Sequence, residues 1–275
     1  MRTSSRFAPL RQPPTSLDDL PRLAAGEETG PARQRPRGGW RRLGGLLTAA
    51  AAFAALAALV SAGKLASVDS YSVRHLMPWF PLNEQGKSFL GTLLSHRGLQ
   101  FHATKVVAVP VTFGAACGLA VALSAILFYQ GHKRAAGLWL LAFIVGNGVE
   151  LLCKNVIVRP PLSAGPGGSS IHISGFDSSF PSGHVIRAVI LIAILVELLP
   201  VARWALIAWL GALVLVLELN GMHTPSDIAG GLLLGVALVG GVSASRELLR
   251  RHFHADTGSP ATASRLLTND LESTS

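Results

Sequence analysis

Long apolar runs dominate this sequence and decide which folds are open to it. The first, Leu43–Gly63, has 21 residues and no charge, which is long enough for an α-helix to cross the hydrocarbon core of a bilayer. Five more candidate spans follow along the chain: Val106–Tyr129, Ala135–Cys153, His184–Leu199, Trp204–Asn220 and Ile228–Ser245. Backbone polar groups cannot stay unpaired in lipid, so such runs fold as helices. The sequence predicts an all-α fold, a polytopic membrane helix bundle with about six transmembrane helices.

The composition supports this class and excludes others. Charged residues make up 14% of the chain and apolar residues 49%, whereas a soluble domain carries about 25% charged residues. The net charge of +9 comes mostly from the tails, where a positive-inside bias explains it better than a nucleic-acid partner does. Cys117 and Cys153 lie in apolar segments and are predicted to be packing residues rather than a disulfide or metal ligands.

The chain divides into three parts by composition. Residues 1–42 are rich in Arg, Pro and Gly and are predicted to form a disordered basic tail. Residues 43–245 hold the spans, and residues 246–275 are predicted to be a second disordered tail. The run Leu43–Gly63 has an alternative interpretation as a cleaved signal peptide, because it has a basic start and ends in small residues.

The basic residues predict the orientation. With six spans, both tails, the loop "GHKRAAG" and the turn "PVARW" fall on one side of the membrane, and all of them carry Lys or Arg. The positive-inside rule makes that side cytoplasmic, with both termini. The loop 154–181 and the turn 221–226 then face the extracytoplasmic side of the cell membrane.

Polar residues gather at that outer boundary in three clusters: "ELLCKNVIVRPP" at 150–161, "FPSGHVIR" at 180–187 and "ELNGMHTPSD" at 218–227. Ionisable side chains at membrane depth are costly and usually face the bundle interior, where they have a function. The three clusters are therefore the candidate functional site.

In the second cluster, Ser182 is a candidate N-cap of a helix that begins at Gly183, with His184 in its first turn. The free N–H groups of a helix N-terminus bind anions, and His184 can donate a proton there. The alternative is a plain capped helix with an incidental interfacial histidine.

In the third cluster, His223 and Asp227 are four residues apart, so on a helix the carboxylate reaches the imidazole. This fixes the tautomer and leaves the other ring nitrogen as a nucleophile or base. Capping by Thr224 or Ser226 is an alternative. A metal site is another alternative, but its spacings match no zinc pattern. Its candidate ligands are His172, Asp177, His184, His223 and Asp227.

In the first cluster, Lys154 and Arg159 lie at the outer end of the third span. Glu150, four residues before Lys154, can pair with it along one helix face. The alternative is snorkelling of the two basic side chains toward lipid headgroups.

Taken in order, the three clusters resemble the type 2 phosphatidic acid phosphatase family of membrane lipid phosphatases. Its pattern is Lys-x6-Arg-Pro, then Pro-Ser-Gly-His, then Ser-Arg-x5-His-x3-Asp. Lys154, the whole of Pro181–His184, His223 and Asp227 match it, and the resemblance covers about Ala135–Ser245.

The chain departs from this pattern at two places. Arg159 stands two positions early after Lys154, and the Ser-Arg pair of the third motif is replaced by Val216 and Leu217. In the family that arginine helps to hold phosphate. Arg187, one helical turn after His184, can replace it; alternatively it forms an ion pair with Glu218 or Glu150.

The resemblance implies a phosphatase domain in residues 43–245 that hydrolyses a lipid phosphate or diphosphate through a phosphohistidine, without a metal or other cofactor. It implies that His223 is the nucleophile, Asp227 orients it and His184 is the proton donor. The implied phosphate-binding residues are Lys154, Arg159, Ser182, Gly183 and Arg187. Candidate substrates are polyprenyl diphosphate, phosphatidic acid and phosphatidylglycerol phosphate.

Two other functions stay open at this point. One is a catalytically degenerate relative that binds lipid phosphate without cleaving it, which the missing Ser-Arg pair favours. The other is a small transporter whose polar pathway uses the charges within the spans. These are Glu150, Arg187, Glu197 and Glu218.

Overall fold

The computed structural model describes residues 37–77, 103–162 and 176–257, with side chains described from residue 43 to residue 251. The described residues are helical and contain no strand, which confirms the all-α prediction. The α-helices are α1 (Arg37–Ser61), α2 (Ala66–His75), α5 (Phe113–Tyr129), α6 (Lys133–Val156), α7 (Gly183–Leu198), α8 (Arg203–Leu219) and α9 (Pro225–Thr257). Three short helical turns join them: the π-turn η2 (Thr104–Ala108) and the 3-10 turns η3 (Val109–Val111) and η6 (Pro200–Ala202).

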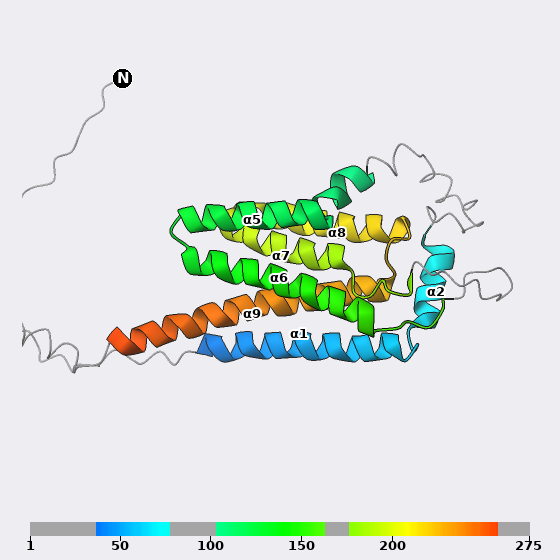
Figure 1. Ribbon diagram of the computed structural model, residues 1–275, viewed down its shortest axis with the longest axis horizontal. Coiled ribbons are helices and arrows are strands. Elements are labelled where there is room, and N and C mark those ends of the chain that lie inside the picture. Colours follow the sequence, from blue (N-terminus) through cyan, green and yellow to red (C-terminus); the bar gives the residue numbers. More distant parts are fainter. Residues whose placement is uncertain (1–36, 78–102, 163–175, 258–275) are drawn as a thin grey trace, which may run out of the picture. The chain divides into compact units, whose positions relative to one another are not determined.

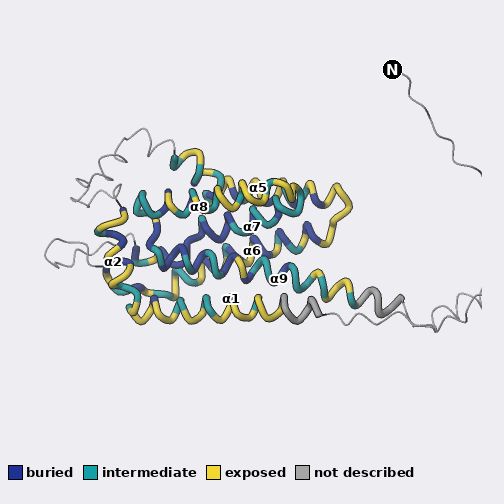
Figure 2. The backbone as a smooth tube through the Cα atoms, turned by 180° about the vertical axis from the view of Figure 1, so that it is seen from behind, coloured by how far each residue is buried: buried dark blue, intermediate teal, exposed yellow. Residues whose placement is uncertain are grey.

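Helix α7 is the centre of the bundle (Figure 1). It packs against α5, α6, α8 and α9, while α1 lies along α9. Its side chains are buried on several faces; Val185, Ile186, Ala188, Ile190 and Ile194 have no exposed surface. A helix that is apolar all round is stable only when it is surrounded by other helices, and Figure 2 shows this concentration of buried residues along α7.

The outward faces of the surrounding helices are apolar as well. Leu47 on α1, Leu141 and Leu151 on α6 and Leu215 on α8 are each at least 56% exposed. Soluble monomers rarely expose large contiguous apolar surfaces, but a bilayer solvates them. The protein is therefore an integral membrane protein.

All six predicted apolar runs are helical, but the number that can cross a membrane differs from six. Four described helices are long and apolar enough, and a fifth span results if η2–η3 and α5 are counted together across their 63° bend. The bend interrupts the predicted run Val106–Tyr129, because Pro110 lacks a backbone N–H for a continuous helix and Thr112 is extended. Helix α7 has 16 residues and ends before Pro200, which disfavours helical backbone at Leu199.

Two helices extend past the boundaries predicted for the spans. Helix α9 continues to Thr257, although Ser245 was the predicted end of the last span and residues 246–275 were predicted to be disordered. The charges after Ser245 are compatible with a helix, because Glu247 pairs with Arg250 and Arg251 three and four residues away. Helix α1 begins at Arg37, within the predicted tail 1–42. The remaining tail residues lie outside the described part.

Small residues set the distance between α7 and α9. A Cβ on Gly231 would lie 2.7 Å from the Ser182 carbonyl oxygen, and one on Gly235 would lie 2.8 Å from the Cβ of Val189. Glycines four residues apart let two membrane helices approach closely. This contact places the first turn of α9 beside the first turn of α7. Elsewhere in the core, Cys117 and Cys153 are half-buried free thiols.

Candidate active site

The three polar clusters meet at one end of the bundle. The first lies at the end of α6, the second at the start of α7 and the third between α8 and α9. Consecutive helices run in opposite directions, so these positions fall at the same level, near α2 (Figure 1). A direct backbone hydrogen bond joins the last two clusters, since the Ser182 N–H donates to the Asp227 carbonyl oxygen at 2.9 Å.

The turn at the end of α8 positions His223 at this site. Gly221 has a φ of 63°, its N–H donates to the Glu218 carbonyl at 2.8 Å, and the Met222 N–H donates to the Leu217 carbonyl at 3.0 Å. These two bonds are the Schellman arrangement, which requires a left-handed residue and therefore favours glycine. The turn reverses the chain directly before His223.

The Asp227 carboxylate, in the third cluster, accepts several hydrogen bonds. Pro225 opens α9, and the Asp227 carboxylate reaches back to accept a hydrogen bond from the Thr224 N–H at 2.9 Å, as an acidic residue in a capping box does. It also accepts from the Ser179 hydroxyl at 2.7 Å and from Arg159 at 2.7 Å. Asp227 has no exposed surface, and these donors compensate its buried charge.

His223 lies beside this carboxylate, as its spacing predicts. Its Nδ1 is 3.7 Å from an Asp227 carboxylate oxygen, just beyond hydrogen-bond length. This nitrogen is buried and has no hydrogen-bond partner among the described residues.

The two histidines face each other across the start of α7 and the start of α9. The ring centroids of His184 and His223 are 5.7 Å apart, with 64° between the ring planes. His184 is half-buried and His223 is buried. The structure thus brings together the three residues expected to carry the chemistry.

Ser182 holds the predicted N-cap position of α7, but its side chain makes no capping hydrogen bond. The Ser182 hydroxyl oxygen is buried and has no partner among the described atoms. The N–H groups in the first turn of a helix have no partner within the helix. An anion at this turn would satisfy both kinds of group.

Arg159 is buried and binds three residues at the start of α9. It donates to the Thr224 hydroxyl at 2.9 Å, to the Ser226 hydroxyl at 2.6 Å and to Asp227 at 2.7 Å. It also lies 3.6 Å from Asp69. Both terminal nitrogens of the guanidinium are therefore engaged within the protein, whereas its buried Nε has no partner among the residues that the structure describes.

Lys154 and Arg187 share one carboxylate, that of Glu150. Lys154 Nζ is 2.6 Å from one oxygen and Arg187 is 2.9 Å from the other, which confirms the predicted Glu150–Lys154 pair. Arg187 also donates to the Asn147 side chain and to the Val111 carbonyl oxygen. Of the partners predicted for Arg187, the structure shows Glu150.

The carboxylate of Glu150 lies against the start of α7. A Cβ on Gly183 would overlap both carboxylate oxygens, so a larger residue there requires Glu150 to shift from its ion pairs with Lys154 and Arg187.

Several residues of the site carry no signal in the local sequence. Asp69, on α2, is 2% exposed and accepts from the Ser226 N–H at 3.2 Å and hydroxyl at 2.7 Å. Ser179 is another, through its bond to Asp227. Both come from stretches between the predicted spans, and a single acidic or hydroxyl residue there is no motif.

The charged side chains that the transporter hypothesis places along one polar pathway instead form separate contacts. Glu150 and Arg187 pair with each other, Glu218 accepts from Ser72 at 2.8 Å, and Glu197 binds Trp139 and Arg246. In the metal hypothesis, His172 lies outside the described residues. Within the described part, no three His, Cys, Asp or Glu side chains are grouped as metal ligands would be.

Comparisons with known proteins support the resemblance. The sequence model of the PAP2 superfamily matches residues 135–251. A similar solved structure is that of a transmembrane PAP2-type phosphatidylglycerolphosphate phosphatase from Bacillus subtilis, with a TM-score of 0.55 and 22% identity over 74% of this chain and 96% of that one. No curated protein matches the chain. The motif order, the helical bundle and the family match agree, and residues 135–251 of the chain match the PAP2 superfamily.

Proposed function

We propose that this protein is a membrane phosphatase that hydrolyses a lipid phosphate through a phosphohistidine intermediate. The observation that carries the proposal is the meeting of two imidazoles, His184 and His223, with a buried carboxylate, Asp227, beside the second. A nucleophile, an orienting carboxylate and a second acid–base group are the set that covalent phosphoryl transfer requires.

In the first step, His223 attacks the phosphorus of the substrate. Its Nδ1 faces Asp227, so a proton held on Nδ1 leaves Nε2 with a free electron pair. A bond forms between Nε2 and phosphorus while the bond from phosphorus to the lipid oxygen breaks. The leaving oxygen takes a proton from His184, across the gap between the two rings.

In the second step, water replaces His223. His184, now neutral, accepts a proton from the water, whose oxygen bonds to phosphorus as the nitrogen–phosphorus bond breaks. Inorganic phosphate leaves, and both histidines return to their starting protonation states. Neither step uses a metal.

Unpaired polar groups at the site favour an anionic ligand. Among the described residues, five buried side chains have a polar atom without a partner, and three of them belong to this site: Arg159, Ser182 and His223. Such groups are rare in folded proteins and need an explanation. The Ser182 hydroxyl and the first N–H groups of α7 supply donors to the phosphate oxygens, together with the unpartnered Nε of Arg159.

Lys154 and Arg187 complete the proposed phosphate site in competition with Glu150. Lys154 is the more mobile of the two, because 30% of its side chain is exposed, against 7% for Arg187. We propose that Lys154 turns from Glu150 to the phosphate and that Arg187 stays paired. Arg187 then acts on the phosphate through its charge rather than by contact.

The substrate is proposed to be an amphiphile on the extracytoplasmic side. The site lies at the end of the spans, where a headgroup meets water while its chains stay in lipid. Polyprenyl diphosphate, phosphatidic acid and phosphatidylglycerol phosphate satisfy this condition. The domain boundaries 43–245 and the cytoplasmic termini belong to the same proposal.

One observation favours a second candidate, a relative that binds lipid phosphate without cleaving it. Leu217 stands where the family has its phosphate-binding arginine, and it has no exposed surface. A cation cannot replace it there without repacking. The binder therefore keeps the anion site but lacks part of the charge that the transition state needs.

The test is phosphate release from a panel of lipid phosphates and diphosphates in detergent with EDTA. We expect release by the wild type and a loss of at least about a thousandfold in His223→Ala and His184→Ala, since each removes a group that acts on the reacting atoms. His132→Ala, at the other end of α6, is the matched control and keeps full activity. Release by His223→Ala would refute the phosphohistidine. Absence of release from every wild-type substrate, with lipid phosphate still bound, would establish the binder.

A further inference from the structure

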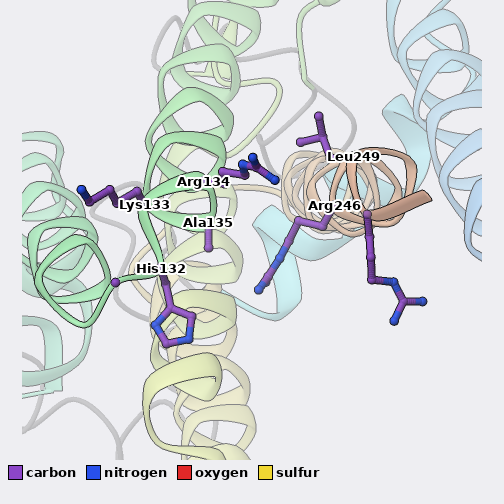
Figure 3. A pocket seen from close by; sticks show the side chains of 8 residues that line it. His132, Lys133, Arg134, Ala135, Arg246 and Leu249 are labelled. Atoms are coloured by element: carbon purple, nitrogen blue, oxygen red, sulfur yellow. The ribbon is translucent and has the colours of Figure 1, made fainter. Parts of the chain in front are cut away.

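A basic cavity lies at the end of the bundle opposite the active site. Its volume is about 520 Å³, and it is formed by the start of α6 and the late turns of α9 (Figure 3). Lys154 and the active site lie at the other end of α6. Because that helix has 24 residues, the two sites are roughly 35 Å apart.

The lining of this cavity is cationic. It includes Lys133, Arg134, Arg246 and Arg250 together with His132, and none of its described members is acidic. Figure 3 shows Arg134 extending from α6 toward α9 and Arg246 extending from α9 back toward the loop before α6. Of these arginines, Arg246 pairs with Glu197 and Arg250 pairs with Glu247.

An apolar groove continues from this cavity along the same two helices. Its volume is about 260 Å³, and its lining includes Leu138 and Ala142 on α6, Gly241 and Val242 on α9, and Leu46 on α1. The two linings join at consecutive residues of α9, since Ser245 belongs to the groove and Arg246 to the basic cavity. The basic cavity therefore lies at the end of the bundle, and the apolar groove extends from it along α6 and α9.

We propose that this cavity and groove are a binding site for an anionic phospholipid. The arginines hold the phosphate of the headgroup, and one acyl chain lies in the groove between α6 and α9. Basic pockets between membrane helices bind anionic headgroups in this way. A free phosphate ion would use the cavity alone, whereas the adjoining groove matches a lipid. The site is separate from the active site, and its lipid is a ligand rather than a substrate.

The headgroup half of the proposal is tested by lipid retention. The full-length protein in detergent is mixed with equal amounts of phosphatidylglycerol and phosphatidylcholine, and the bound lipids are counted by native mass spectrometry. We expect preferential retention of phosphatidylglycerol, reduced about tenfold or more in the double variant Arg134→Gln/Arg246→Gln, because charge-assisted hydrogen bonds are lost. Arg203→Gln is the matched control. Arg203 begins α8 at the same end of the bundle, lies outside the cavity lining and is expected to change nothing.

The acyl-chain half is tested by filling the groove. A Cβ on Gly241 meets no atom within 4 Å, and Gly241 belongs to the groove lining, so Gly241→Leu places a larger side chain in the groove from an open position. We expect this variant to lose phosphatidylglycerol as the arginine variant does. Gly211→Leu, on α8 with equally open surroundings, should retain it.

Three outcomes would overturn the proposal. They are equal retention of the two lipids by the wild type, unchanged retention in the double variant, and a preference lost equally in the Arg203→Gln control. A fourth arm identifies the source of the phosphate group. If inorganic phosphate or glycerophosphoglycerol displaces the lipid at equal concentration, the cavity is an ion site and the groove has no role.

Discussion

Removal of Arg159 should destabilise the protein more than removal of any cation on its surface. The substitution Arg159→Met keeps an unbranched apolar stem and deletes the guanidinium. Its loss leaves two buried carboxylates without their shared cation: Asp227, with no exposed surface, and Asp69, 2% exposed. The hydroxyls of Thr224 and Ser226 lose a donor at the same time.

The expected loss in the free energy of unfolding depends on the hydrogen-bond donors that Asp227 and Asp69 keep. Removing one partner of a buried ion pair costs about 3–5 kcal/mol. Asp227 keeps the Ser179 hydroxyl and the Thr224 N–H as donors, and Asp69 keeps both donors of Ser226. The loss should therefore lie near the lower limit, about 3 kcal/mol. On the scale of about 2–4 °C per kcal/mol for domains of this size, the melting temperature falls by roughly 6–12 °C.

The assay is thermal unfolding in one fixed detergent, followed by the fluorescence of the five tryptophans. Lys154→Met is the matched control, because Lys154 pairs with Glu150 at similar length but has 30% of its side chain exposed. A partly exposed pair contributes about 0–1 kcal/mol, and Glu150 keeps Arg187. The control should therefore melt within about 4 °C of the wild type.

A double variant separates charge from packing. Asp69→Asn removes one of the two uncompensated charges, so Arg159→Met/Asp69→Asn should recover part of the lost melting temperature. The reasoning would be refuted if Arg159→Met melted within about 2 °C of the wild type. A double variant that melted lower still, by the sum of the single effects, would also contradict it, because interacting sites are not additive.

Two further predictions concern contacts of the α6 side chains Glu150 and Trp139. Gly183→Ala places a methyl group on the Glu150 carboxylate. We expect this variant to release phosphate at least about tenfold more slowly and to have a lower melting temperature. Its control is Gly148→Ala, whose methyl group enters open space and should leave the stability unchanged or slightly higher. Trp139→Phe removes the 2.8 Å hydrogen bond from the indole to Glu197 and should cost about 1 kcal/mol, seen as a lower melting temperature with unchanged phosphate release.

The sequence predicts the helices well and their interruptions poorly. Each apolar run forms a helix, because lipid leaves the backbone no other way to pair its polar groups. The bend at Thr112 is a local effect of Pro110, a residue that an apolar window counts as one position among many. The extension of α9 beyond Ser245 was missed for the opposite reason. Its charged residues suggest a tail, although Glu247 and its arginines pair along the helix.

The same division holds at the site. Contacts between near neighbours follow from spacing, as in the pairs His223–Asp227 and Lys154–Glu150. Contacts that cross the fold do not. The bond between Asp69 and Ser226 joins residues 157 positions apart, and it depends on where α2 lies against the start of α9. No property of either residue alone indicates that contact.

The balance of charge at the site has a consequence for the chemistry. Among the described residues, Lys154, Arg159 and Arg187 are paired with three carboxylates, Glu150, Asp69 and Asp227, so the formal charges cancel apart from the histidines. In the proposed mechanism, an anionic phosphate enters a site whose described ion pairs leave no net positive charge. Its charge is then met by the N–H groups at the start of α7, by a proton on His184 and by a cation that leaves its carboxylate. Since the arginine position of the third motif is the buried Leu217, we propose that the release of Lys154 from Glu150 is the step that separates a phosphatase from a protein that only binds lipid phosphate.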